Sequence, residues 1–225
     1  MDQIIAVIGP PAAGKTTLTT RLGEAPGCAV FRLREHVPEP VLAAASANPD
    51  RVDWIDDLTV TRVLRAYIGR AAADKSFHTV LLDNFPGSAL QVELLLGVVS
   101  RLAPACGVMA VELRVDERTR QQRMENRRVC HTCEHDPVRD PRLPATPSSS
   151  DPWRCARCGG LLHPRRGDAP RLFSARTARF EAEAPAVRQA LADVGVAIVT
   201  TDVGRPVEAI SEELSLLIAS GSLSS

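Results

Sequence analysis

The sequence predicts an α/β fold in which a five-stranded parallel sheet lies between helical layers and carries one inserted segment. Three observations support this fold class. A glycine-rich loop follows the first apolar run, five apolar runs alternate with helical patterns, and four cysteines form two Cys-x-x-Cys pairs in an irregular stretch. Alternating strands and helices favour parallel sheets, whose ligand crevice lies at the carboxyl ends of the strands.

The strands and helices follow from short apolar runs and from helical periodicity. The expected strands are residues 4–8, 28–31, 79–82, 109–115 and 196–200. The expected helices are residues 16–23, 58–73, 88–102, 117–128, 174–194 and 207–219. From about 130 to 170 the chain is rich in Pro, Arg and Cys without a clear period, so this stretch is predicted to be an insertion.

Composition excludes several classes of protein. The chain has 225 residues, 44% hydrophobic and 24% charged, which fits a globular unit and not a disordered chain. No apolar run approaches the ~20 residues that span a bilayer, and no basic leader precedes the first strand, so we expect a cytoplasmic protein without a membrane partner. Basic and acidic residues number 27 each, which disfavours a uniformly basic nucleic-acid binder.

The charge is unevenly distributed along the chain. Residues 114–179 hold 15 arginines and 8 acidic residues, a net charge of +7, and the remainder is correspondingly acidic. Genomic base composition explains part of the arginine excess. The position of the basic segment nevertheless predicts a region that attracts anions.

Residues 9–16 read Gly-Pro-Pro-Ala-Ala-Gly-Lys-Thr and satisfy the phosphate-loop pattern G-x-x-x-x-G-K-[ST] between a strand and a helix. Backbone amides of such a loop wrap a phosphate, the lysine places a charge on it, and the threonine hydroxyl reaches Mg²⁺. The pattern predicts a P-loop NTPase-type fold that binds a nucleoside triphosphate with Mg²⁺. The predicted nucleotide-binding residues are Gly9, Pro10, Ala12, Ala13, Gly14, Lys15, Thr16 and Thr17, together with Asp83.

Asp83 ends the third apolar run, where a carboxylate can hold Mg²⁺ through water. A polar strand end without a metal is an equally good interpretation of that residue.

The two cysteine pairs give a stronger indication of a metal site. Cys130, Cys133, Cys155 and Cys158 have the spacing of a tetrahedral Zn²⁺ site, and four thiolates leave no open position, so the zinc is predicted to be structural.

Several arginines flank the insertion. Arg123 and Arg127 are four residues apart on an expected helix, Arg165 follows the second cysteine pair, and Arg176 begins the next helical pattern. Each could be a solvated surface residue. Together they lie where a triphosphate needs cationic groups, and planar guanidinium groups suit phosphoryl transfer.

These motifs identify a resemblance. The phosphate loop, Leu82-Asp83-Asn84-Phe85-Pro86, residues 123–130 and residues 155–168 leading to Arg176 resemble the adenylate kinase family in its zinc-lid form, over nearly the whole chain. The resemblance implies a core at 1–31, 61–126 and 169–225, an acceptor-binding segment at 32–60 and a zinc lid at 127–168. It also implies that Lys15, Arg123, Arg127, Arg165 and Arg176 contact the transferring phosphates, and that Arg123 packs on the adenine of the donor nucleotide as well. Asp168 is implied to orient Arg165 or Arg176. The family's first lid aspartate is replaced by Gly167, which predicts a looser arginine–aspartate network.

The acceptor half departs from the family pattern. The two arginines that grip the acceptor phosphate fall on Gly87 and Pro38 here. Arg32 and Arg34 could substitute for them, or could be alternating surface residues at a strand end. The remaining acceptor-binding candidates are Asp56, Phe85 and Gln91.

The resulting hypothesis is a monomeric ATP-dependent phosphotransferase. It would move the γ-phosphoryl group of Mg·ATP to a nucleoside monophosphate or another small phosphate-bearing acceptor, and not to AMP bound in the standard way. One alternative is a catalytically silent ATP-binding or regulatory protein. Another is a zinc-ribbon nucleic-acid binder, which the scarcity of aromatic residues (4%) disfavours.

Overall fold

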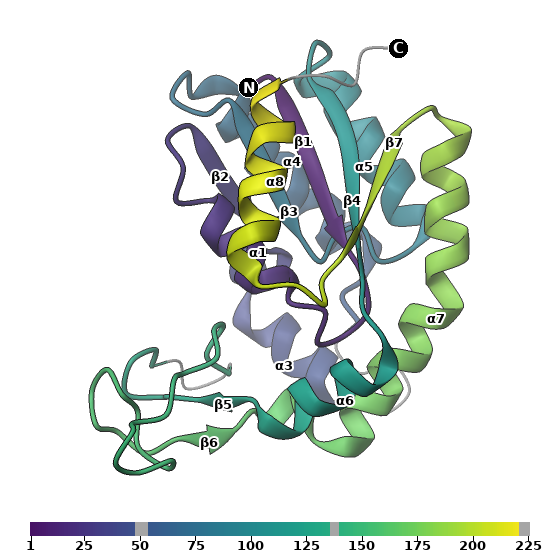
Figure 1. Ribbon diagram of the computed structural model, residues 1–225. Coiled ribbons are helices and arrows are strands. Elements are labelled where there is room, and N and C mark those ends of the chain that lie inside the picture. The colour runs from purple at the N-terminus through teal and green to yellow at the C-terminus, as the bar shows by residue number, and fades with distance from the viewer. Residues whose placement is uncertain (48–53, 136–139, 221–225) are drawn as a thin grey trace.

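The computed structural model describes residues 1–47, 54–135 and 140–220. Five parallel strands form the main sheet in the order β2-β3-β1-β4-β7 (Figure 1). Their bounds are β1 Gln3–Ile8, β2 Cys28–Phe31, β3 Thr79–Asp83, β4 Gly107–Arg114 and β7 Ala197–Asp202. The predicted five-stranded parallel sheet is therefore confirmed, with β1 at its centre.

Helices cover both faces of this sheet (Figure 1). In one buried cluster, Ile4 and Ala6 of β1 pack with residues of α4, α5 and α7. In the other cluster, Ile5 and Val7 of β1 pack with residues of α1 and α8. Alternate residues of β1 thus enter opposite cores, as the two-residue period of a strand requires. The helices are α1 Lys15–Leu22, α4 Asp57–Ala73, α5 Ala89–Leu102, α6 Glu117–Asn126, α7 Pro170–Asp193 and α8 Val207–Ser220.

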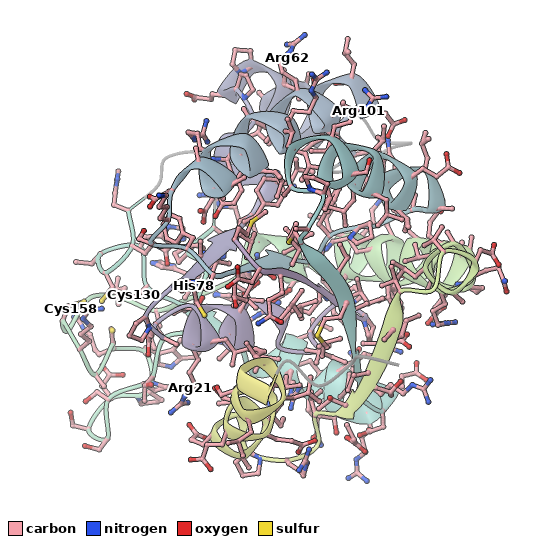
Figure 2. The ribbon with its side chains drawn as sticks, turned by 90° about the horizontal axis from the view of Figure 1, so that it is seen from above. Arg21, Arg62, His78, Arg101, Cys130 and Cys158 are labelled. Atoms are coloured by element: carbon pink, nitrogen blue, oxygen red, sulfur yellow. The ribbon has the colours of Figure 1, made fainter. Side chains whose placement is uncertain are left out.

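Figure 2 shows the same layers from above. Arg62 and Arg101 mark the outer surface of α4 and α5, whereas Arg21 lies on the opposite side with α8. There the Nη1 of Arg21 donates a hydrogen bond to Glu208 Oε1 at 2.6 Å. The described helices include none that is long and apolar enough to cross a membrane.

Two helices differ from the sequence prediction at their ends. Helix α7 begins at Pro170, four residues earlier than expected, because proline suits the first turn, where its missing N–H costs no hydrogen bond. Helix α6 ends at Asn126, so Arg127 is its C-cap in extended backbone at φ −65° and ψ 125°. Arg123 and Arg127 are therefore not on one helix face as predicted, although the Arg127 amide still donates to the Arg123 carbonyl.

The segment after β2 contains two short helices, α2 (Leu33–His36) and α3 (Glu39–Ala47), before α4. The irregular stretch between α6 and α7 is anchored by a small antiparallel sheet of β5 (Arg128–Val129) and β6 (His163–Pro164). A 3₁₀ turn, η1 (Arg166–Asp168), then leads into α7. In Figure 1 this stretch, called the lid below, projects from the end of the molecule where α6 and α3 lie.

Candidate functional site

The loop between β1 and α1 lies at the carboxyl end of the central strand, and two of its residues require glycine. Gly9 has φ +148° and Gly14 has φ +94°. A side chain at Gly9 would also collide with β4, since a Cβ there would lie 2.8 Å from the Leu113 carbonyl oxygen. The glycines therefore permit backbone angles and a close approach that other residues would not.

Lys15 is the buried cation of this loop. Its Nζ donates hydrogen bonds to the carbonyl oxygens of Gly9 and Pro10, both at 2.7 Å. Burial, together with the positive charge of Arg176, lowers the pKa of Lys15 to about 7, although Asp83 acts in the opposite direction. An anion next to this amine would favour its charged form, so the loop is an anion-binding arrangement.

Arg127 and Asp168 form a two-point ion pair where the lid meets the core. Arg127 Nε donates to Asp168 Oδ2 at 2.6 Å, and its Nη2 donates to Oδ1. Asp168 is buried, so this pair holds the start of the lid to the turn that ends it. One carboxylate of the expected network is thus present, but its side-chain hydrogen bonds come from Arg127, whereas the resemblance implied Arg165 or Arg176.

Arg165 and Arg176 lie close to this pair. Burial lowers the pKa of Arg165, and the neighbouring charge of Arg127 lowers it further. Arg176 Nη1 donates a hydrogen bond to the Gly167 carbonyl at 2.9 Å. Lys15, Arg127, Arg165 and Arg176 thus form a cluster of like charges at one place, which favours a polyanion between them.

Arg123 is bound to the phosphate loop from outside. Its Nη1 faces the carbonyl oxygens of Ala12 and Ala13 at 3.4 and 3.3 Å, and its Nη2 donates to the Val203 carbonyl at 2.7 Å. This arginine therefore joins α6, the loop and the segment after β7. Such a position leaves its planar group at the edge of the loop.

Arg32 does not point freely into the site. Its Nε donates to Asp83 Oδ2 at 3.1 Å and its Nη2 donates to Thr20 Oγ1 at 2.7 Å. Both side chains of the ion pair are largely buried. The other carboxylate oxygen, Asp83 Oδ1, is buried without a hydrogen-bond partner among the described residues.

Three other expected acceptor residues make contacts within the fold. Gln91 is buried, and its Oε1 accepts a hydrogen bond from the Gly87 amide at 2.8 Å. Phe85 packs edge-on against Phe31 with ring centroids 6.0 Å apart. Asp56 is the N-cap of α4, where its carboxylate accepts from the Thr59 amide at 2.9 Å.

A single cavity of about 1250 Å³ brings most of these groups together. It extends from the phosphate loop past Asp83 and the arginine cluster to Arg34, Phe85 and Gln91. This volume exceeds the range of about 300–1,000 Å³ typical of a pocket for one small ligand. A site of this size can accommodate two ligands with their reacting groups close together.

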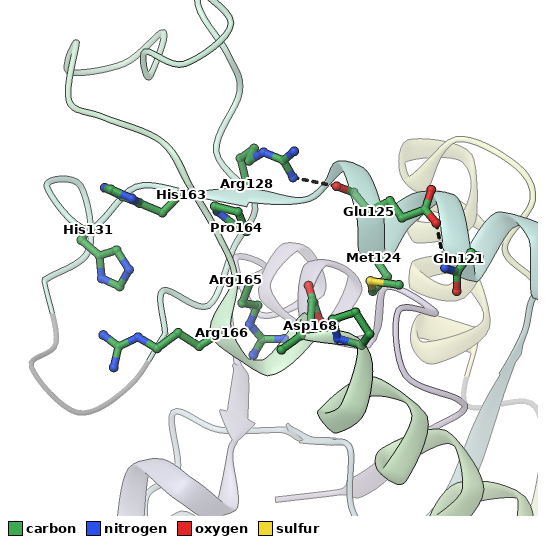
Figure 3. A pocket seen from close by; sticks show the side chains of 12 residues that line it. Gln121, Met124, Glu125, Arg128, His131, His163, Pro164, Arg165, Arg166 and Asp168 are labelled. Atoms are coloured by element: carbon green, nitrogen blue, oxygen red, sulfur yellow. Dashed lines mark hydrogen bonds between the residues drawn. The ribbon is translucent and has the colours of Figure 1, made fainter.

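A second hollow of about 810 Å³ lies where α6, the lid and the start of α7 meet (Figure 3). It shares Arg165 and Arg166 with the main cavity. In Figure 3, Arg166 extends toward the lid, away from Asp168. The lid turn 165–168 therefore separates the two hollows.

The cavity residues that the sequence analysis did not identify include Trp54, Arg179, Asp140 and Arg142. Trp54 lies under the Arg179 guanidinium, whose Cζ is 5.7 Å from the ring centroid, and both line the cavity. Asp140 and Arg142 reach it from the lid. The three-residue spacing of Arg179 from Arg176 on one helix could have indicated Arg179. No pattern in the sequence indicates that Asp140 and Arg142 reach the cavity.

The four lid cysteines converge. Their Sγ atoms all lie within 4.8 Å of one another, and neighbouring pairs are 3.3–3.7 Å apart. A tetrahedral site with Zn–S bonds of about 2.3 Å has sulfur–sulfur edges of about 3.8 Å. The cluster, to which Cys130 and Cys158 in Figure 2 belong, could thus hold a metal ion.

Comparison with known sequences identifies the family of the chain. Residues 5–133, more than half of its length, match the family described as the AAA domain. The chain belongs to the AAA domain family. This AAA domain protein is also similar to proteins named adenylate kinase. That of Symbiobacterium thermophilum is 26% identical over 91% of this chain and 98% of its own length. That of Bacillus velezensis is 25% identical over 76% of this chain and 78% of its own.

A third adenylate kinase, from Sphingopyxis alaskensis, is 27% identical over 75% of both chains. The AAA domain match and the parallel sheet confirm the predicted P-loop fold, and the four-cysteine cluster is consistent with a zinc lid. The relatives named adenylate kinase support the resemblance to a nucleotide kinase.

Proposed function

We propose that this chain transfers the γ-phosphoryl group of Mg·ATP to the phosphate of a nucleoside monophosphate or a chemically related acceptor. The observation that carries the proposal is the cavity of about 1250 Å³, which is lined by the phosphate loop, by the arginine cluster and by the aromatic side chains of Trp54 and Phe85. Phosphoryl transfer depends mostly on positioning and on stabilising charge, and this arrangement supplies both. The relatives named adenylate kinase support the same reaction class.

The phosphate loop is the donor end of the proposed site. The amides from Gly9 to Thr16 would surround the β-phosphate, and Lys15 would exchange its two carbonyl contacts for phosphate oxygens. Arg123, held at the edge of the loop, is placed to lie against the donor nucleotide. Arg127, Arg165 and Arg176 would then neutralise the charge that spreads over the transferring group.

The donor set near the loop fits Mg²⁺. Asp83 Oδ1 is a buried carboxylate oxygen without a hydrogen-bond partner among the described residues, and the hydroxyl of Thr16 lines the same cavity. Magnesium prefers oxygen ligands and keeps several waters, and it would supply charge neutralisation at the β- and γ-phosphates. Asp83 and Thr16 would hold it.

The acceptor end supports a substrate other than AMP bound in the standard way. Arg32 is committed to Asp83 and Thr20, so it does not supply a free replacement for the arginines missing at Pro38 and Gly87. Trp54 offers a planar apolar surface at this end of the cavity. A planar base or ring on the acceptor would stack there, with its phosphate toward Arg165 and Arg176.

The cysteine cluster is proposed to bind one structural Zn²⁺ through Cys130, Cys133, Cys155 and Cys158. The buried apolar cluster among the described residues of the lid consists of Cys130, Cys155 and Leu162 with Ala145 packed against them, and two of these residues are themselves proposed ligands. Such a small cluster would hold the lid folded only weakly without a metal. Four thiolates leave no open coordination position, so this metal would fix the lid and take no part in the reaction.

The test is phosphotransfer from Mg·ATP over a panel of nucleoside monophosphates and other phosphate esters, followed by chromatography of the products. The proposal expects turnover with at least one acceptor and slow turnover with AMP. AMP phosphorylation at rates ordinary for nucleotide kinases would refute the altered acceptor site. Tight ATP binding without product on any acceptor would favour the silent regulatory protein instead.

A further inference from the structure

The turn that ends the lid contains Gly167 between Arg166 and Asp168. The backbone of Gly167 is hydrogen-bonded to two further charged side chains. The Gly167 amide donates a hydrogen bond to Asp140 Oδ2 at 2.9 Å. The Gly167 carbonyl accepts one from Arg176 Nη1 at 2.9 Å. One peptide segment thus links a carboxylate from the middle of the lid to an arginine of α7.

Asp140 also faces two arginines of the same turn. Its Oδ2 lies 3.8 Å from Arg165 Nε, and its Oδ1 lies 3.7 Å from Arg166 Nε. The Asp140 side chain is only 11% exposed. A carboxylate this buried acts on nearby charges with little screening by solvent. Asp140 therefore offsets part of the repulsion around Arg165, in addition to Asp168.

The Asp140 carboxylate lies close to where a side chain on residue 167 would lie if that residue were not glycine. A Cβ added to Gly167 would lie 3.6 Å from Asp140 Oδ2 and 3.3 Å from Arg176 Nη1. A carboxylate on residue 167 would therefore reach the same space that the Asp140 carboxylate occupies. The glycine leaves room for Asp140 to enter from the lid.

We propose that Asp140 is a positioning residue, which takes the place of a carboxylate at position 167 and holds Arg165 and Arg176 in the arrangement that binds the transferring phosphates. It acts on Arg165 directly and on Arg176 through the Gly167 peptide. The inference rests on the proposed function, because it assigns those arginines to phosphate. It corrects the expectation that Gly167 leaves the network loose.

The experiment moves the carboxylate. Asp140→Ala removes it, Asp140→Asn removes only its charge, and the double variant Asp140→Ala/Gly167→Asp supplies it from the other position. Asp151→Ala is the matched control, because Asp151 is a half-exposed lid aspartate that accepts a hydrogen bond from the Trp153 amide. Circular dichroism and zinc content confirm that each variant is folded.

Asp140→Ala is expected to lower kcat about tenfold and to weaken Mg·ATP binding about fivefold in calorimetry, with Asp140→Asn between it and the wild type. The double variant should recover at least half of each loss on a logarithmic scale, and Asp151→Ala should stay within twofold of wild type. A purely structural role would not be rescued from residue 167.

Two results would overturn the inference: Asp140→Ala within twofold of wild type in both measurements, or a folded, zinc-loaded double variant with no recovery. The ATP affinities keep this test separate from the proposed function. If the wild type binds Mg·ATP but phosphorylates no acceptor, the proposed function fails while the affinities still decide the role of Asp140.

Discussion

Lys15 should take up a proton when the chain binds Mg·ATP. Burial brings the pKa of this amine to about 7 in the ligand-free protein, so at pH 8 only about 10% of it is charged. A triphosphate against Nζ favours the charged form and raises its pKa toward the ordinary value. Binding at pH 8 should therefore consume about 0.9 proton, and binding at pH 7 about 0.5, where half of the amine is already charged.

Calorimetry in two buffers with different ionisation enthalpies measures this uptake directly. The observed binding enthalpy at pH 8 should differ between the buffers by about 0.9 of the difference in their ionisation enthalpies. The matched variant Lys15→Met has an unbranched side chain of similar size that cannot titrate. Its binding enthalpy should therefore lack the difference between buffers that comes from Lys15. Equal enthalpies in both buffers for the wild type, or equal uptake by the variant, would refute the reasoning.

The same pKa has a consequence for the ligand-free protein. The folded-state pKa of Lys15 lies below its unfolded value, so between about pH 7 and 10.5 the unfolded chain binds more protons. Stability must then rise with pH across this window, and Lys15→Met should remove that rise. Urea unfolding of both proteins at pH 7 and 9 provides the comparison.

Three further outcomes follow from the site. Lys15→Ala should transfer no measurable phosphate while its circular dichroism stays native, and near-wild-type turnover would place the phosphate site elsewhere. Asp168→Asn leaves the largely buried Arg127 with a weaker partner, so it should lower the free energy of unfolding by about 3 kcal/mol and Tm by about 6–12 °C. An unchanged Tm would show that the ion pair is dispensable. Protein purified without chelator should contain about one Zn²⁺ per chain, and Cys133→Ser should reduce that content and make the lid sensitive to proteolysis; metal-free wild type with four titratable thiols would remove this site.

The core was predictable because its determinants are local. The apolar runs, the phosphate-loop pattern and the alternation of strands with helices depend on residues adjacent in the chain, and the structure places all five strands in one parallel sheet. The helix ends were less accurate. The start of α7 at Pro170 and the end of α6 at Asn126 are set by the turn and the small sheet that flank them, which periodicity does not register.

The cysteine set was equally predictable, because spacing alone indicates a metal knuckle, and the four Sγ atoms do meet. The acceptor end was not. Arg32 was a candidate for the acceptor phosphate on the basis of sequence position, but its guanidinium pairs with Asp83 across 51 residues of sequence. Asp56 was a candidate as well, and the structure gives it the role of a helix cap.

The sequence by itself determined the sheet, the phosphate loop and the metal cluster, since each rests on a pattern within a few residues or on a fixed ligand spacing. Only the tertiary structure decided which charges pair. Asp140 reaches Gly167 and Arg165 from 27 and 25 residues away, and the Trp54 ring meets the Arg179 guanidinium although the two residues are far apart in the sequence. The reason is physical: a buried charge is stabilised by whatever opposite charge or dipole the fold brings within a few ångströms, and separation along the chain says nothing about that distance.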